Sequence, residues 1–161
     1  MPHHKLNIDA VTSVDYKTLK VTSTAFLEGA IIPTKYTYDG ENVNPPLNIK
    51  GAPEDTQCLV IIMEDLDAPI RIWKHWLAWN IHSISKIKEG RIMEAEGIND
   101  FGENKYNGPC PYSGMHRYCF KVYALKEILN LPTTSTTREL ERAMSEHIIA
   151  FGELMGMYKR A

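Results

Sequence analysis

Two histidines and a carboxylate stand at the ends of apolar, strand-like runs of this sequence. His116 follows a loop rich in glycine and proline and begins the run HRYCFKVYAL, whereas His75 begins the run HWLAWNI. Asp65 ends the continuous apolar run CLVIIMED, and a second carboxylate, Asp67, follows it closely. Because side chains alternate along a strand, His116 and Tyr118 are expected on one face. Polar groups in these positions suit a pocket at the rim of a sheet.

The same alternation predicts the neighbours of the other two polar groups. Asp65 should continue the face of Met63, and His75 should share a face with Leu77 and Trp79. The polar residues lie far apart along the chain, so only the fold can bring them together.

Binding of a small anion is the chemistry that these residue types favour. A charged histidine donates from both ring nitrogens and a neutral one from a single nitrogen. The loop at Gly108 and Pro109 can present backbone N–H groups to an oxyanion, and Tyr118 adds a hydroxyl donor. A carboxylate does not suit an anion directly, so we assign Asp65 the role of orienting a histidine and keeping it protonated.

Other interpretations of these residues stay open at this stage. A histidine at a strand end is more often structural than ligand-binding, and Asp67 with Arg117 is expected to pair and hold the loop to the sheet. The alternative function is a phosphoester hydrolase or transferase that uses a histidine as general base, or Asp65 and Asp67 as ligands of a divalent metal. The sequence offers neither a convincing nucleophile nor a complete set of metal ligands. We therefore predict a binding protein without catalytic residues, metal or cofactor.

Composition sets limits on the class of protein. The 161 residues, of which 24% are charged and 43% hydrophobic, are expected to form a single domain over residues 1–161. The net charge of −2 and the lack of a basic run argue against nucleic-acid binding. The longest apolar run, Cys58 to Met63, is far shorter than the roughly 20 residues that span a bilayer.

The first residues lack the apolar core of a signal peptide, and the odd number of cysteines, three, shows no metal-like spacing. Both observations predict a cytoplasmic protein with reduced thiols.

Strand-like runs separated by turn signals dominate the first 125 residues. They are expected at residues 16–24, 34–38, 58–65, 75–81 and 116–125. The C-terminal part differs, because apolar residues from Leu140 to Phe151 follow helical spacing and place His147 near the apolar face. Thr136 and Glu139 form a capping-box pattern, and Gly152 and Gly156 are expected to end or loosen the helix. The pattern predicts a β-dominated α+β fold.

Three segments resemble the phosphatidylethanolamine-binding protein family, which includes the Raf kinase inhibitor proteins. They are EDLDAP, WKHWLAWNI and GPCPYSGMHRYCFKVYAL, and the segments YDGENVNPPL and HIIAFGELMGMYKR resemble the bacterial and archaeal branch. The resemblance covers roughly residues 25 to 160. It implies a large antiparallel β-sheet packed on a smaller sheet, with helical structure towards the C-terminus.

The resemblance also implies a ligand pocket and its residues. Family members bind phosphate-like anions, including phosphorylethanolamine and nucleotides, and some modulate kinases or inhibit proteases. Prokaryotic members are often dimeric, so a homodimer is expected. The matching pocket positions in this sequence are Asp65, His75, Gly108, Pro109, His116 and Tyr118.

Three positions depart from the family pattern. Leu66 stands where a proline is usual, which we expect to loosen the backbone beside Asp65. The segment from Ile70 to Lys74 is short and lacks glycine, and Tyr112 replaces a second common proline. These differences are expected to change the shape of the pocket mouth.

Overall fold

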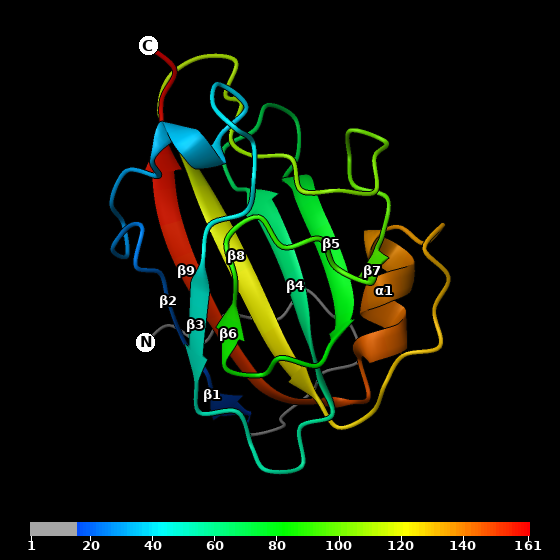
Figure 1. Ribbon diagram of the computed structural model, residues 1–161. Helices are drawn as coiled ribbons and strands as arrows, with labels where there is room; N and C mark the ends of the chain where they lie inside the picture. Colours follow the sequence, from blue (N-terminus) through cyan, green and yellow to red (C-terminus); the bar gives the residue numbers. More distant parts are fainter. Residues whose placement is uncertain (1–15) are drawn as a thin grey trace.

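The computed structural model describes residues 16–161, and its largest element is a six-stranded sheet with the order β1-β9-β8-β4-β5-β7 (Figure 1). The strands are β1 (Lys17–Thr18), β4 (Cys58–Asp65), β5 (Trp73–Ile81), β7 (Ala95–Glu96), β8 (His116–Leu125) and β9 (Ile148–Tyr158). Neighbouring strands are antiparallel except that β1 is parallel to β9. The sheet is therefore mixed, where the family resemblance implied a purely antiparallel one.

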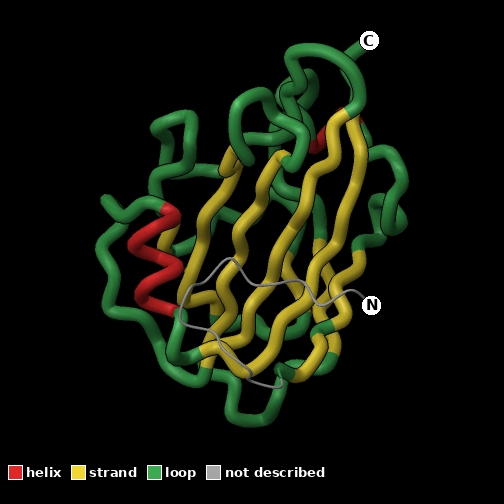
Figure 2. Tube along the Cα trace, turned by 180° about the vertical axis from the view of Figure 1, so that it is seen from behind, coloured by secondary structure: helices red, strands yellow, loops and turns green. Residues whose placement is uncertain are grey.

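A three-stranded antiparallel sheet packs on one face of the large sheet (Figure 1). Its strands are β2 (Lys20–Thr22), β3 (Leu47–Lys50) and β6 (Lys86–Ile87). Side chains such as Leu47 and Ile87 join Ile61 and Phe120 of the large sheet in one buried cluster. The only α-helix among the described residues, α1 (Thr137–Met144), covers part of the other face (Figure 2). The predicted arrangement of a large sheet, a smaller sheet and a C-terminal helix is confirmed.

The central strands follow the hydrophobic pattern of the sequence closely. All eight residues of β4 are buried, as expected for a continuous apolar run in a strand that is covered on both faces. Ile61 packs towards the smaller sheet, whereas Val60 and Ile62 belong to a second cluster with Leu140 of α1. Burying one such aliphatic side chain contributes roughly 1.5–3 kcal/mol. These two clusters hold β4 in the centre of the molecule.

The prediction of a helix that extends to Phe151 is wrong beyond Met144. The capping box is present, because the carboxylate of Glu139 accepts a hydrogen bond from the backbone N–H of Thr136 (3.1 Å). Residues 148–158 instead form β9, and every second residue of this strand is buried. His147 is half-buried in the turn between α1 and β9, rather than on a helix face.

Two glycines in this segment allow other parts of the chain to pack closely on the strand. Gly152 and Gly156 lie on the buried face of β9 and do not end a helix. A Cβ atom at Gly152 would lie 2.2 Å from the carbonyl oxygen of Leu19, and one at Gly156 would lie 2.5 Å from the side chain of Ile32. Glycine is therefore needed here because other chain segments pack directly on the strand backbone.

The strand predicted at residues 34–38 is also wrong. Residues Thr34–Tyr36 form the short 3-10 helix η1, which begins after Pro33. Both the backbone N–H (3.0 Å) and the side-chain hydroxyl (2.8 Å) of Thr37 donate to the carbonyl of Thr34. These local hydrogen bonds replace the ladder that a strand would need.

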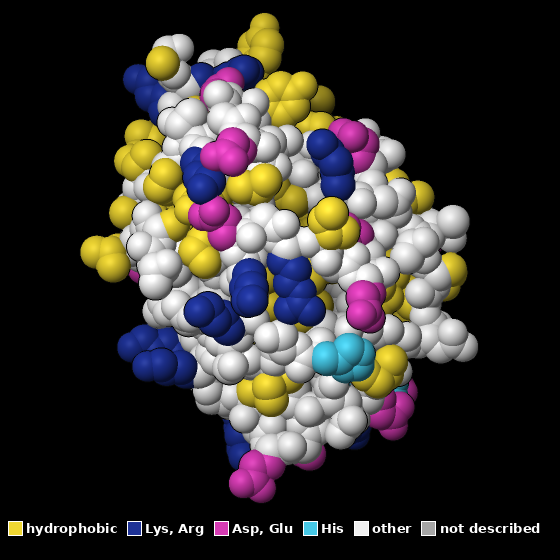
Figure 3. All heavy atoms as spheres, in the orientation of Figure 1, with side chains coloured by type: hydrophobic (Ala, Val, Ile, Leu, Met, Phe, Trp, Pro, Cys, Tyr) yellow, Lys and Arg dark blue, Asp and Glu magenta, His cyan; other side chains and the backbone are white. Residues whose placement is uncertain are grey.

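Surface charge is mixed on the face that carries the smaller sheet. Lysine and arginine side chains are spread among acidic and apolar ones on this face (Figure 3). Within residues 16–161, no helix has the length and apolar character to cross a membrane. The thiols of Cys58, Cys110 and Cys119 are free.

Candidate functional site

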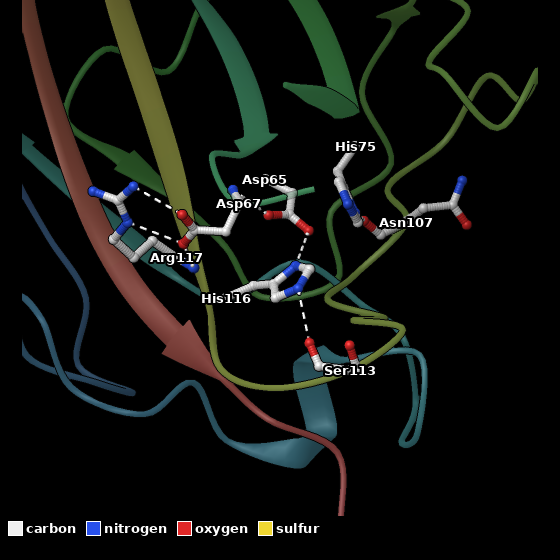
Figure 4. Close-up of polar contacts among 7 residues, drawn as sticks. All are labelled: Asp65, Asp67, His75, Asn107, Ser113, His116 and Arg117. Atoms are coloured by element: carbon white, nitrogen blue, oxygen red, sulfur yellow. Dashed lines mark hydrogen bonds and ion pairs between the residues drawn. The ribbon is translucent and has the colours of Figure 1, made fainter. Parts of the chain in front are cut away.

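Asp65, His116 and Tyr118 meet where β4 ends and β8 begins. The pairing of the two strands places Asp65 directly opposite Tyr118. His116 Nδ1 lies 2.7 Å from Asp65 Oδ2, and Figure 4 shows the two side chains pointing at each other. The His116 and Tyr118 rings stack with centroids 6.4 Å apart. The structure thus brings together three of the predicted site residues at one end of the sheet.

His75 reaches the same place through a β-bulge in β5. The residue pairs Met63–Trp76 and Glu64–Lys74 are adjacent along β4, yet one extra residue, His75, lies between their partners in β5. A bulge of this kind redirects a side chain and often lies beside a functional site.

Because of the bulge, the predicted direction of the His75 side chain is wrong. Leu77 and Trp79 belong to the cluster beneath α1, on the opposite face from Tyr118. The His75 ring instead meets Tyr118 edge-on, with centroids 5.4 Å apart and planes at 87°. Simple alternation was wrong here because it assumes an unbroken register.

The environment of His75 favours its neutral form. Nδ1 lies 2.7 Å from the carbonyl oxygen of Asn107, and because a carbonyl can only accept, Nδ1 carries the hydrogen. Burial lowers the pKa of His75, and this effect outweighs the carbonyls of Asn107 and Gly108 and the charge of Asp65, which act in the opposite direction. An anion bound beside this ring would favour the charged form.

His116 has an oxygen acceptor at each ring nitrogen. Besides the Asp65 contact at Nδ1, its Nε2 lies 3.1 Å from the carbonyl oxygen of Ser113 (Figure 4). Neither a carboxylate nor a carbonyl oxygen can donate, so the imidazolium, with two N–H groups, satisfies both contacts. Asp65 is therefore positioned for the role that the sequence assigned to it.

The carboxylate of Asp67 pairs with Arg117 and takes no part in the candidate site. Its carboxylate accepts hydrogen bonds from the backbone N–H (2.8 Å), Nε (2.9 Å) and Nη2 (2.8 Å) of Arg117. These hydrogen bonds lower the pKa of Asp67. The predicted pairing of Asp67 with Arg117 is confirmed.

Leu66 strengthens the backbone between the two carboxylates. Its N–H donates to the carbonyl of Arg117 (2.9 Å), and a proline in this position would have no N–H for that bond. The Asp65 Oδ1 atom accepts the N–H of Asp67 (2.8 Å) in the same turn. The expectation that Leu66 loosens this segment is therefore wrong.

Tyr118 is the one predicted donor that remains available. The residue is fully buried, and its hydroxyl meets no partner in good hydrogen-bond geometry among residues 16–161, although the Cys110 backbone and the Asp65 carboxylate lie beside it. Burial, followed by the charge of Asp65, raises the pKa of Tyr118 far above its ordinary value of 10.0, so the hydroxyl keeps its proton. A buried donor without a partner is costly, which makes this group a candidate to bind a guest.

The loop at Gly108 and Pro109 forms a wall but does not present free N–H groups. The Gly108 N–H already donates to Asn42 Oδ1 (2.7 Å), and proline has no N–H. A Cβ atom at Gly108 would lie 2.2 Å from the carbonyl oxygen of Tyr36. Glycine is thus required for close packing against η1, and the predicted use of its N–H for an anion is not available here.

Three contributors to the site escaped the sequence-based prediction. The carbonyls of Asn107 and Ser113 fix the two histidine rings, but a carbonyl is common to every residue and has no sequence signature. Asn99 donates to the carbonyl of His75 (3.1 Å), and its Oδ1 accepts the N–H groups of Phe101 and Glu103 (both 3.0 Å). The only sequence signal for the role of Asn99 was its position immediately before the turn-like segment DFGEN.

The two carboxylates are not arranged as a metal pair. Asp65 contacts His116, whereas Asp67 pairs with Arg117. Across the part of the chain that the structure describes, no group of three or more His, Cys, Asp or Glu side chains is placed to hold a metal ion.

A shallow, open depression of about 620 Å³ lies at the other end of β4. It is lined by Lys17 and residues 51–55, at the loop that leads into the strand. None of the predicted site residues lines it, so it is separate from the histidine site.

Comparisons with known proteins agree with the fold and cover nearly the whole chain. The family described as "Phosphatidylethanolamine-binding protein" matches residues 22–159. A UPF0098 protein of Pyrococcus abyssi is 48% identical over an alignment of 149 positions, and the alignment covers 86% of this chain and 84% of that protein. A UPF0098 protein of Chlamydia trachomatis is 39% identical over 88% of this chain and 99% of its own length.

Two crystal structures are similar in three dimensions. A phosphatidylethanolamine-binding protein homologue from Chlamydia trachomatis has a TM-score of 0.85 at 38% identity and covers 90% of this chain and 99% of its own. YbcL of E. coli, described as a member of the mammalian family, has a TM-score of 0.81 at 27% identity, over 89% of this chain and 99% of its own.

Proposed function

The chain belongs to the phosphatidylethanolamine-binding protein family, and from this membership we propose that it is a non-enzymatic binding protein for a small phosphate-type anion. Phosphate, phosphorylethanolamine or a nucleotide-like group fits this class. The observation that carries the proposal is the convergence of His75, His116 and the unpartnered hydroxyl of Tyr118 at one end of the large sheet.

The chemistry of these groups supports an anion as the guest. The hydroxyl of Tyr118 is a buried donor that meets no acceptor in good hydrogen-bond geometry among the described residues, and a charged His75 would offer an N–H at Nε2 besides the one that the Asn107 carbonyl accepts. The Asp65 carboxylate lies 2.7 Å from His116 Nδ1 and orients its ring, so the site combines an oriented imidazole with a buried donor. An oxyanion would accept from the Tyr118 hydroxyl, whereas a cationic group in the same position would leave that donor unsatisfied.

The alternative of a phosphoester hydrolase has no specific observation in its favour. A metal held by Asp65 and Asp67 would have to displace His116 and Arg117 from these carboxylates. His75 Nδ1 is occupied by the carbonyl of Asn107, and the lowered pKa of this residue does not by itself separate binding from base catalysis. We therefore assign binding rather than turnover.

The proposal predicts that phosphate or phosphorylethanolamine stabilises the protein. Ligand that binds only the folded state adds RT ln(1 + [L]/Kd), or about 2.7 kcal/mol at 100 times Kd, which corresponds to a rise in Tm of roughly 5–10 °C for a chain of this size. His116→Ala is expected to abolish this rise, because it removes the ring that contacts Asp65 and stacks on Tyr118 in the site. Differential scanning fluorimetry over a phosphate titration measures both.

His82→Ala is the matched control for that titration. His82 is exposed and follows the opposite end of β5 from the bulge, so its loss should leave the phosphate response unchanged. Equal responses of the wild type and His116→Ala would contradict the assigned site. A phosphate response that is absent from all three proteins would contradict anion binding itself.

Two further expectations rest on the family resemblance alone. We propose that the chain forms a homodimer and that the anion site modulates binding to a protein partner such as a kinase or protease. No described residue identifies that partner. We also propose, from the character of the first residues and the cysteines, that the protein acts in the cytoplasm.

A further inference from the structure

A backbone carbonyl of the protein itself contacts His116, the histidine that the proposed site needs. The Ser113 carbonyl oxygen lies 3.1 Å from His116 Nε2, on the side of the ring away from Asp65 (Figure 4). With Asp65 at Nδ1, both N–H groups of the imidazolium are used within the protein. An anion therefore cannot receive a hydrogen bond from His116 until the Ser113 carbonyl leaves.

The peptide that carries this carbonyl is placed to rotate. It joins Ser113 to Gly114, in an exposed stretch that runs from Tyr112 to Met115. Gly114 has φ +73°, and a Cβ atom added to it would meet nothing within 4 Å. Rotation of the peptide by half a turn changes φ of the following residue by about the same amount, which would carry Gly114 into the negative range that L-residues prefer.

We propose that the Ser113–Gly114 peptide is a two-position switch that opens the site to its anion. In the closed position its carbonyl binds His116 Nε2, as the structure has it. In the open position the carbonyl turns outward, and the Gly114 N–H points to the place that the carbonyl left. The inference rests on the proposed function, and it specifies how the site admits a ligand.

Peptide rotation reverses the polarity of the site wall. A carbonyl oxygen repels an anion, whereas an N–H donates to it, so one rotation removes an unfavourable dipole and adds a donor. It also frees the His116 Nε2–H for the same anion. The anion thus has a large differential affinity for the two positions, which is what a ligand needs in order to shift an equilibrium.

Gly114→Ala tests the switch directly. Alanine is disfavoured at φ +73° but not at negative φ, and its methyl group meets no neighbour, so the substitution weakens only the closed position. Because apparent affinity scales with the fraction of open protein, we expect inorganic phosphate to bind up to about fivefold more tightly, the limit reached when the closed position dominates and a left-handed alanine costs roughly 1 kcal/mol. Isothermal titration calorimetry measures the dissociation constants.

Gly29→Ala is the matched control. Gly29 is also exposed, has φ +77° and would place an added methyl group more than 4 Å from any neighbour, but it contacts β9 at Met155 rather than the site. Its phosphate affinity should equal that of the wild type. Unchanged or weaker phosphate binding by Gly114→Ala, with normal binding by the wild type, would overturn the switch and leave the proposed function standing.

NMR of the wild-type protein gives a second measurement that does not depend on a variant. In a phosphate titration the Gly114 amide proton should shift downfield as it begins to donate to the anion. A shift confined to His75 and Tyr118 would overturn the switch while supporting the site. No phosphate-induced change at any of these residues would overturn both the switch and the proposed function.

Discussion

Replacing Glu64 with glutamine is expected to lower the free energy of unfolding by roughly 3 kcal/mol at neutral pH. Glu64 is 1% exposed and lies between the ammonium groups of Lys74 and Lys121, with Lys121 Nζ 2.7 Å from Oε1. The side chains of both lysines are more than four-fifths buried. Glutamine keeps the size of the side chain but leaves two desolvated cations without an anion between them.

Equilibrium urea denaturation measures this loss of stability, and the size of the loss should depend on pH. Burial raises the pKa of Glu64, but the two lysines outweigh burial and the net direction is below the ordinary value of 4.5. A depressed carboxyl pKa contributes stability that is present above the unfolded pKa and is lost as pH falls through the folded one. The difference between wild type and Glu64→Gln should therefore shrink in acid, below about pH 4.5.

Glu41→Gln is the control for the buried network. Glu41 is exposed and lies 3.8 Å from Lys35, so its loss should cost less than about 1 kcal/mol. A Glu64→Gln protein with the stability of Glu41→Gln, or one whose deficit does not change with pH, would show that the network carries no net stabilisation.

Gly152→Ala is expected to lower the free energy of unfolding by about 3 kcal/mol, because the chain around β9 has no room for a methyl group. The added Cβ would lie 2.2 Å from the Leu19 carbonyl oxygen and 2.8 Å from its carbonyl carbon, so the backbone of a neighbouring segment must move. The sign of the change separates strand from helix. In a helix the same substitution would raise stability by about 1 kcal/mol.

Gly29→Ala again supplies the comparison, this time for stability. Its methyl group meets nothing, and only the positive φ is strained, so the cost should be about 1 kcal/mol. Urea denaturation of both variants separates the steric cost from the conformational one. A stabilised Gly152→Ala protein would argue that residues 148–158 are helical in solution.

Some parts of this architecture follow directly from the sequence. The runs that became β4 and β8 are apolar and long, so their strands and the shared face of His116 and Tyr118 could be predicted from alternation. The pairing of Asp67 with Arg117 could be predicted from charge and position. In each case the determining interactions lie within a strand or between residues at its end.

Other parts depend on contacts that the sequence does not display. The direction of the His75 side chain is set by an extra residue in β5. That residue is recognised as extra only when β5 is aligned with β4, so the sequence of β5 alone does not reveal it. The strand β9 has apolar residues at spacings that also suit a helix, and its glycines have meaning only when Leu19 and Ile32 pack on them. The Ser113 carbonyl beside His116 depends on the path of an exposed loop.

The loop between Cys110 and Met115 is fastened at both of its ends. Before it, the Pro109 carbonyl accepts the N–H of Tyr38 (3.0 Å), and after it Asp65 and Asp67 hold the consecutive residues His116 and Arg117 on opposite faces of β8. A span with fixed anchors can change in length without disturbing them. Insertions at Tyr112 to Gly114 would therefore lengthen the loop beside His116 and could admit larger ligands, while Asp65 and Tyr118 stay where they are.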